Sequence, residues 1–199
     1  MNDRKLIANV TLSIDGFASG PGGDMSWLVE HAVHEQMTTY FAGVWSGADT
    51  VLLGRNNYEG FHGFWPSVAA DPNGSGRAHD MAVWLDRVEK VVFSTTLTEA
   101  PWQNSRIAER DLETEVRELK AASGRDIIVL SSASVIRTLL KADLVDELRI
   151  HLAPSILGAG LRFFDDGIPA SDWVLDGANT MVTGSISLTY RRKTANSTP

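Results

Sequence analysis

The sequence predicts an α/β fold built on a mixed, mostly parallel sheet with helices on both faces. Short apolar segments rich in β-branched residues alternate with segments of helical periodicity through most of the 199 residues. Such alternation is typical of parallel strands joined by right-handed helical crossovers. The C-terminal part instead contains short strand-like segments with turn residues and no helix between them, which predicts antiparallel strands added to the parallel sheet.

Five apolar segments are expected to form buried strands, because they are short, rich in Val, Ile and Leu, and bounded by turn residues. These strands are residues 5–13, 50–53, 89–93, 126–130 and 147–152. Between them, apolar residues at helical spacing predict helices at residues 27–41, 77–86, 111–122 and 133–142. The C-terminal strands are expected within "LRFF" at 161–164, "WVLDGAN" at 173–179 and "GSISLTYRR" at 184–192.

A single domain is expected over residues 1–193, since one core grows to roughly 250 residues before a chain tends to split. Residues 62–77 are rich in Gly, Pro, Asn and Ser, and this composition predicts a flexible loop rather than a domain boundary. The polar residues 194–199 predict a disordered tail.

Charge and cysteine content narrow the class of protein. A net charge of −7 and a pI near 5.2 oppose binding to nucleic acid, which requires a concentrated Lys/Arg surface. The absence of cysteine excludes disulfides, thiolate metal sites and a Cys nucleophile. The polar start "MNDRK" does not resemble a signal peptide, and no apolar stretch approaches the roughly 20 residues that span a bilayer. We therefore expect a cytoplasmic protein with no membrane partner.

The segment "VLLGRNNYEGF" at 51–61 is the first candidate for a ligand site. A buried strand ends in Gly54, and Arg55 and Asn56 begin the predicted helix. A helix N-terminus presents unpaired N–H groups and a partial positive charge, which suits a phosphate group. The alternative is a tight turn at Gly54 and a solvated Arg55, because one Gly-Arg pair is a weak motif.

Two further strand ends carry clusters of hydroxyl groups. The first cluster precedes the helix at 133–142, and the second follows the strand at 89–93. These hydroxyls either bind phosphate and ribose oxygens or cap the helix and close local turns. Ligands of parallel α/β sheets bind beyond the carboxyl ends of the strands, so together the turns predict a dinucleotide site that includes Ser94, Thr95, Thr96, Ser131, Ser132, Ala133 and Ser134.

Several segments, taken in order, resemble the RibD C-terminal branch of the dihydrofolate-reductase-like family. They are "VTLSIDGFASG", "LLGRNNYE", "VVFSTTL", "SSASVIRTLLKADLVDELRIHLAPSILGAGLRFF" and "LTYRR". The resemblance implies a three-layer dihydrofolate-reductase-like fold, an NADPH site and frequent homodimers. It also implies that Gly54 and Arg55 lie near the adenosine phosphates, residues 94–96 near the adenine ribose, and residues 131–134 along the pyrophosphate. The family usually has a Gly pair where this chain has Ser131 and Ser132.

The residues that would contact the compound that accepts the hydride are predicted on weaker signals. Asp15, in "SIDGF", is the candidate proton donor because it lies where the active-site loop of the resembling family begins, although Asp-Gly is also a common turn dipeptide. Asp24 and Trp27 are candidates for substrate contact from a glycine-bearing loop able to close over a substrate. His31 and His34 lack the His-Glu-x-x-His spacing of metalloproteases, so no metal site is expected.

The leading hypothesis is an NADPH-dependent oxidoreductase that transfers hydride to a small heterocyclic or carbonyl substrate, with NADH left open as cofactor. The resemblance implies a reaction similar to that of 5-amino-6-(5-phosphoribosylamino)uracil reductase of riboflavin biosynthesis, and a homodimer. Two alternatives remain. One is dihydrofolate reductase activity, and the other is a non-catalytic nucleotide-binding or regulatory protein on the same fold, which the Ser131–Ser132 departure favours.

Overall fold

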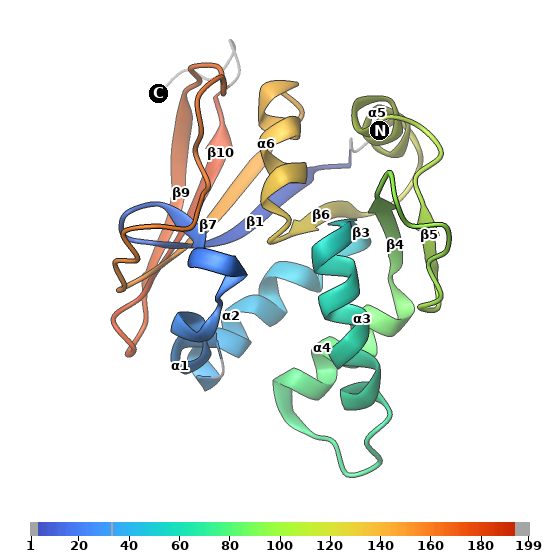
Figure 1. Cartoon of the computed structure of the whole chain (residues 1–199), viewed down its shortest axis with the longest axis horizontal. Coiled ribbons are helices and arrows are strands. Elements are labelled where there is room, and N and C mark those ends of the chain that lie inside the picture. Colours follow the sequence, from blue (N-terminus) through green and yellow to red (C-terminus); the bar gives the residue numbers. More distant parts are fainter. Residues whose placement is uncertain (1–3, 33, 194–199) are drawn as a thin grey trace.

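The centre of the molecule is an eight-stranded sheet with the strand order β5-β4-β3-β6-β1-β7-β10-β9 (Figure 1). The computed structural model describes residues 4–32 and 34–193. The central strand β1 (Leu6–Ser13) pairs in parallel with β6 (Asp126–Leu130) on one side and β7 (Glu147–Ala153) on the other. These three strands are among the expected buried segments.

The parallel part continues beyond β6 through three further strands. These are β3 (Ala48–Gly54), β4 (Glu89–Phe93) and β5 (Ser105–Ile107). The short strand β5 was not predicted, because "SRI" lacks the apolar run that marks the others. The parallel pairing places the carboxyl ends of β1, β3, β4 and β6 along one edge of the sheet.

The C-terminal strands extend the sheet in the antiparallel sense, as predicted. β10 (Ile186–Arg192) pairs antiparallel with β7, and β9 (Trp173–Thr180) pairs antiparallel with β10 at the sheet edge. The prediction for "LRFF" was wrong in one respect. β8 (Leu161–Arg162) does not join the main sheet but pairs with β2 (Phe17–Ser19) in a separate two-stranded sheet.

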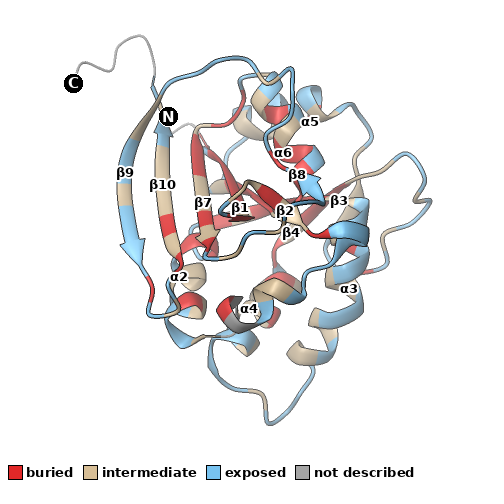
Figure 2. Cartoon of the chain, turned by 60° about the vertical axis from the view of Figure 1, so that its left-hand side comes forward, coloured by how far each residue is buried: buried red, intermediate tan, exposed pale blue. Residues whose placement is uncertain are grey.

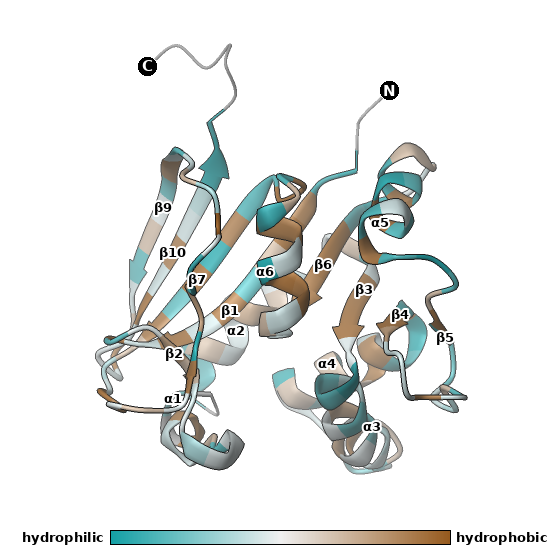
Figure 3. Ribbon diagram, turned by 45° about the horizontal axis from the view of Figure 1, so that its top comes forward, coloured by the Kyte–Doolittle hydropathy of each residue, from teal (hydrophilic) through white to brown (hydrophobic). Residues whose placement is uncertain are grey.

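Helices cover both faces of the sheet, which gives the three-layer α/β arrangement (Figure 1). One face carries α2 (Glu35–Trp45), α3 (Arg55–Ala69) and α4 (Gly76–Arg87), and the other carries α5 (Leu112–Ala121) and α6 (Ala133–Lys141). Alternate strand residues feed two cores, so Val51 and Leu53 pack on the first face and Leu52 packs on the second. Figure 2 shows the inner strands as the most buried elements, and Figure 3 shows them as the most hydrophobic.

Two helical predictions are corrected by the structure. The expected helix 27–41 is divided into a 3₁₀ turn (Ser26–Leu28), α1 (Val29–Ala32) and α2, and the His34 side chain caps α2 by accepting a hydrogen bond from Gln36 N at 3.2 Å. The expected loop 62–77 is largely helical, because α3 continues to Ala69 despite Pro66. Aromatic residues of α3, including Phe61 and Trp65, pack against the core, so tertiary packing overrides weak helix propensity.

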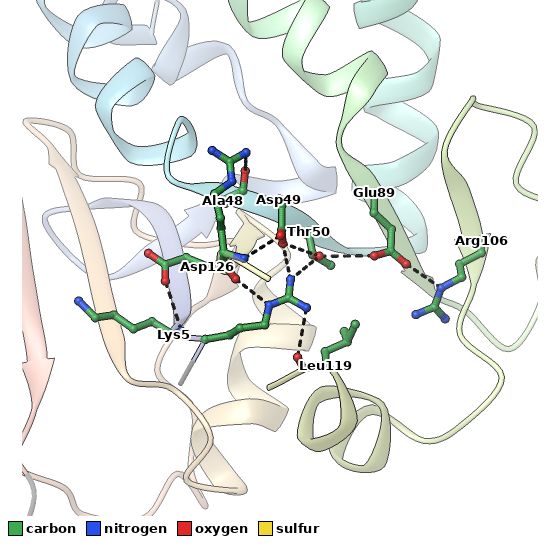
Figure 4. Close-up of polar contacts among 10 residues, drawn as sticks. Lys5, Ala48, Asp49, Thr50, Glu89, Arg106, Leu119 and Asp126 are labelled. Carbon is green, nitrogen blue, oxygen red and sulfur yellow. Dashed lines mark hydrogen bonds and ion pairs between the residues drawn. The ribbon is translucent and has the colours of Figure 1, made fainter. Parts of the chain in front are cut away.

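A polar network joins the amino ends of the strands, opposite the edge described above. Arg4 is 6% exposed, donates to Thr50 Oγ1 at 2.7 Å and forms an ion pair with Asp49. Figure 4 shows Thr50 linked through Glu89 to Arg106, which lies 3.0 Å from the Glu89 carboxylate. A buried cation is tolerated only when its partners are in place, so this network fixes β1, β3 and β4 relative to one another.

The predicted tail, residues 194–199, lies outside the described residues. Within the described part of the chain, no helix combines the length and apolar character needed to cross a bilayer.

Candidate active-site cleft

A cleft of about 1140 Å³ lies at the carboxyl ends of the parallel strands. This is where open α/β sheets bind their ligands. The three predicted turns contribute to its walls, together with residues of α3, α6 and the segment 18–28. Its lining includes Val10, Thr11, Ala18, Ser19, Gly23, Met25, Leu28, Gly54, Arg55, Asn56, Asn57, Gly60, Phe61, Phe93, Ser94, Thr95, Thr96, Ala108, Arg110, Asp111, Leu112, Ser131, Ala133, Ser134, Arg137 and Leu161.

The turn at Gly54 joins β3 to α3, as the sequence predicted. Gly54 is the N-cap of the 15-residue helix α3. It lies next to the first residues of α6. A Cβ added at Gly54 would lie 3.5 Å from Val135 Cγ2 and 3.7 Å from Ser134 Oγ. Any larger side chain at this position would therefore fill the gap between the two turns, which glycine leaves open.

Arg55 projects from the first residue of α3 towards the cleft. Its side chain is 48% exposed, and Nη1 donates to Thr96 Oγ1 at 3.1 Å. Glu59, one helical turn on, lies 3.9 Å away and is itself exposed. Arg55 therefore connects the turn after β3 to the turn after β4 while its guanidinium remains largely available to an anion.

The turn after β4 is closed by its own hydroxyl groups. Ser94 Oγ accepts hydrogen bonds from Thr96 N at 3.1 Å and Leu97 N at 3.0 Å. The local-turn alternative is therefore correct for Ser94, yet Ser94, Thr95 and Thr96 all line the cleft. A closed turn that holds Thr96 against Arg55 presents these polar groups in fixed positions.

The serine turn between β6 and α6 has two distinct parts. Ser131 adopts a left-handed conformation with φ 51°, which is unusual for a residue with a side chain and which glycine adopts without cost. Ser132 is 2% exposed and does not line the cleft. Its Oγ accepts a hydrogen bond from Gly54 N at 3.0 Å. Ser132 therefore links the two turns, while Ser131, Ala133 and Ser134 face the ligand space.

Three charged residues of the cleft were not found from the sequence. Arg110 and Asp111 follow β5 and begin α5, and Asp111 caps that helix by accepting from Thr114 N at 3.0 Å. This strand-to-helix turn repeats the architecture of the others, but it was missed because β5 was missed. Arg137 lies one turn into α6, where it is 20% exposed and pairs with Asp165 at 3.0 Å.

Asp15 lies outside the cleft lining and connects two loops instead. Its carboxylate accepts hydrogen bonds from Ser13 Oγ at 2.7 Å, Leu157 N at 3.1 Å and Gly158 N at 2.7 Å. The hydrogen bond from Ser13 and those from the backbone lower its pKa to about 2. A carboxylate that is ionised at neutral pH has no proton to donate, so the geometry favours a structural function for Asp15.

Asp24 and Trp27 are not among the residues that line the cleft. Asp24 accepts from Ser26 N at 2.9 Å and from Ser26 Oγ at 3.0 Å, and these bonds lower its pKa. Trp27 Nε1 donates to the carbonyl of Asp24 at 3.2 Å. Their neighbours Met25 and Leu28 face the cleft in their place. In this segment the cleft lining therefore includes Met25 and Leu28 and not the two residues that the sequence predicted.

Comparison with models of protein families shows the family to which this chain belongs. The model of the RibD C-terminal domain matches residues 4–187, which is nearly the whole chain. The chain belongs to the RibD C-terminal domain family. The chain is similar to the uncharacterized protein YyaP of Bacillus subtilis (strain 168), to which it is 28% identical over 190 residues, covering 96% of each protein.

Several solved structures have the same fold as this chain. A putative riboflavin biosynthesis protein from Shewanella sp. PV-4 has a TM-score of 0.74 at 22% identity, covering 96% of this chain and 99% of that chain. A bifunctional diaminohydroxyphosphoribosylaminopyrimidine deaminase/5-amino-6-(5-phosphoribosylamino)uracil reductase from Thermotoga maritima has a TM-score of 0.65 at 14% identity, covering 96% and 57%. Dihydrofolate reductase from Enterococcus faecalis, complexed with NADP(H), has a TM-score of 0.62 at 14% identity, covering 96% and 97%.

These likenesses confirm the predicted fold and family. The eight-stranded mixed sheet with helices on both faces is the arrangement of a dihydrofolate-reductase-like protein. Membership of the RibD C-terminal domain family, together with riboflavin-biosynthesis neighbours, supports a reductase-like role. The cofactor, the acceptor and the site residues belong to the proposal that follows.

Proposed function

We propose that this protein is an NADPH-dependent reductase of a small heterocyclic or carbonyl compound, with the cofactor bound along the cleft. The observation that carries the proposal is the convergence on one cleft of three turns that each follow a parallel strand, with Arg55 joining two of them. In each turn, backbone N–H groups at a helix start or fixed hydroxyls face the cleft. This set of groups suits a ligand with several phosphates.

The cleft residues fit a dinucleotide in a definite order. The N-terminus of α6, with Ser131, Ala133 and Ser134, would hold the pyrophosphate, because helix N–H groups and the helix dipole favour anions. Gly54 would allow the cofactor to approach the backbone, and Arg55, with the 94–96 turn, would hold the adenosine ribose and its 2′-phosphate. When bound, NADPH supplies the hydride, and the protein orients it and excludes water.

Asp15 is not proposed as the proton donor. Asp15 is held as an ionised carboxylate by Ser13 and by the backbone at 157–158. Its proposed function is to fix the loop after β1 against the loop after β7. Among the described side chains that line the cleft, Asp111 is the one carboxylate, and it is engaged in capping α5.

For the acceptor, the names of the structural neighbours favour a compound like 5-amino-6-(5-phosphoribosylamino)uracil, the substrate named for the Thermotoga maritima protein. Dihydrofolate is the second candidate, because dihydrofolate reductase from Enterococcus faecalis has the same fold. A homodimer is also proposed. β9 is an edge strand with Leu175 52% exposed, and light scattering would then give twice the chain mass of 21.7 kDa.

The direct test is to titrate the protein with NADPH and with NADH while measuring the fluorescence of its six tryptophans. The proposal predicts saturable quenching by NADPH that is stronger than quenching by NADH. Loss of NADPH absorbance on addition of an acceptor would then separate a reductase from a non-catalytic nucleotide-binding protein. If neither nucleotide gives a saturable change, the proposed function is wrong.

A further inference from the structure

The cleft has apolar walls where it passes between α3 and the segment that precedes α1. Met25 and Leu28 line it from that segment, and Phe61 lines it from the second turn of α3. Phe61 is also packed against the hydrophobic core on the α3 face of the sheet. Figures 1 and 3 show α1 and α3 well apart from each other. We refer to Met25, Leu28 and Phe61 as the apolar walls, and to the space between them as the acceptor end of the cleft.

Apolar side chains continue from the acceptor end onto the surface of the protein. Phe64 follows Phe61 by three residues, so both lie on one face of α3, and Phe64 is 56% exposed. On the other side, Met25 is 43% exposed, and Val29, next to Leu28, is 60% exposed. Exposed apolar patches mark binding sites for ligands or partners. An apolar part of a ligand would therefore be covered from both sides at this end of the cleft.

Two of the arginines that line the cleft belong to its opposite end. Arg55 begins α3, six residues before Phe61, and its side chain is directed towards the turn after β4, where it donates to Thr96. Arg110 follows β5, the last strand on that side of the sheet, and forms an ion pair with Glu118. These two cations therefore lie where the adenosine half of the cofactor is proposed to bind.

The third arginine of the lining is matched by an acidic side chain. Arg137 of α6 donates from Nη1 to Asp165 at 3.0 Å and to the carbonyl of Arg162 at 3.3 Å. Its positive charge is therefore offset within the protein. Among the described residues of β1 and of the segments 18–28 and 56–61 that line the cleft, none carries a charged side chain.

Two uncharged polar side chains accompany the apolar walls. Thr11 lines the cleft from β1, and its hydroxyl can donate a hydrogen bond to a ligand or accept one from it. Asn57 lines the cleft from α3, and its Nδ2 donates to the carbonyl of Leu130 at 3.3 Å, which fixes the amide. A phosphate or carboxylate that leaves water needs a cation or several N–H donors. The acceptor end instead provides apolar contact and single uncharged hydrogen-bonding groups.

We propose that the acceptor is an uncharged compound with an apolar substituent, and that this substituent binds between Met25, Leu28 and Phe61. The proposal rests on the proposed reductase function and narrows its acceptor. The names of the structural neighbours favour an acceptor with a phosphoribosyl group, whereas the charges that line the cleft favour an acceptor with neither phosphate nor carboxylate. The polar part of the acceptor would lie at Thr11, and its apolar substituent would extend between the apolar walls towards Phe64.

The test compares two fluorescent probes that differ by one charged group, on protein saturated with NADP⁺. N-phenyl-1-naphthylamine is uncharged, and 8-anilinonaphthalene-1-sulfonate has the same rings with an added sulfonate. The fluorescence of both probes increases in an apolar site. The proposal predicts saturable binding of the uncharged probe, and binding of the sulfonate that is weaker by roughly tenfold or more, because an unpaired anion loses its hydration there. Titration with NADP⁺ comes first, so that failure of the cofactor site is distinguished from failure of the acceptor end.

Met25→Lys tests the position of the site by adding one cation to the apolar walls. Met25 is partly exposed, so the protein should tolerate the lysine. The variant should weaken binding of the naphthylamine and strengthen binding of the sulfonate, each by roughly fivefold, the effect of one partly exposed charge pair. Met25→Gln is the uncharged control of the same length, and it should not strengthen binding of the sulfonate. Leu175→Lys adds the same charge at an exposed position on β9, remote from the cleft, and should change neither affinity.

Three results would overturn the proposal while leaving the reductase function standing. With NADP⁺ bound normally, they are no binding of the naphthylamine, binding of the sulfonate that is equal or tighter, and the same increase in sulfonate binding in Leu175→Lys as in Met25→Lys. The last result would show that the probes bind to the protein surface in general. Absence of NADP⁺ binding would instead contradict the proposed function, and the proposed acceptor with it.

Discussion

The hydrogen bond between Ser132 and Gly54 gives the sharpest prediction about the cofactor turns. Ser132 Oγ accepts from Gly54 N at 3.0 Å, and Ser132 is 2% exposed. Ser132→Ala therefore leaves a part-buried N–H without this partner. Such a loss costs about 1–3 kcal/mol. For a domain of this size, the melting temperature should fall by roughly 2–12 °C.

Ser134→Ala is the matched control. Ser134 carries the same hydroxyl group two residues further along the chain, and it lines the cleft. It should leave the melting temperature within about 2 °C of the wild type and weaken NADPH binding about fivefold, the effect of one hydrogen bond. Thermal unfolding followed by circular dichroism and NADPH titration followed by fluorescence measure the two effects. If Ser132→Ala keeps its stability but loses NADPH affinity, Ser132 binds phosphate directly and the structural assignment is wrong.

Three further predictions concern charge. Arg55→Ala should weaken NADPH at least tenfold but NADH less than threefold in the same titration, since one charge-assisted contact contributes roughly 1.5–3 kcal/mol; equal losses would show that Arg55 does not bind the 2′-phosphate. The pKa of Asp15 is lowered from 3.8 to about 2, so its stabilising effect is complete above pH 4 and is lost as the pH falls to 2. In urea unfolding, Asp15→Asn should lose this pH dependence of stability. A pH–stability profile of Asp15→Asn equal to that of the wild type would refute the assignment. The pKa of His151 is lowered from 6.5 to about 4, so stability should fall as the pH drops from 6.5 to 4, by on the order of 3 kcal/mol; His151→Leu should remove that component, and a slope equal to that of the wild type would contradict the burial of a neutral imidazole.

Much of the fold was predictable because local patterns and the tertiary structure agree. The strands β1, β3, β4, β6 and β7 are continuous apolar runs, and parallel strands buried on both faces require such runs. The misses occurred where local signals are weak. β5 is only three residues long, and α3 continues through Pro66 because its aromatic residues pack into the core. Neither feature is encoded in a single stretch of sequence.

The cleft lies where the sequence predicts a ligand site, and its lining includes most of the predicted cofactor residues but not Ser132. The three turns converge because each follows a parallel strand, and that rule applies to any such sheet. The direction of individual side chains does not follow from the rule. Ser132 faces Gly54 instead of the cleft, and Asp15 is bound by the backbone at 157–158, over 140 residues further along the chain. Contacts between distant segments determined both outcomes.

A structure of the protein crystallised with NADP⁺ tests the central claim most directly. We expect the pyrophosphate at the N-terminus of α6, within hydrogen-bond distance of backbone N–H groups at 131–134, and the 2′-phosphate at Arg55. The nicotinamide ring should then lie towards Thr11 and Phe61. Cofactor bound elsewhere on the protein, or crystals grown in saturating NADP⁺ without nucleotide in the cleft, would contradict the assignment of this cleft as a nicotinamide site.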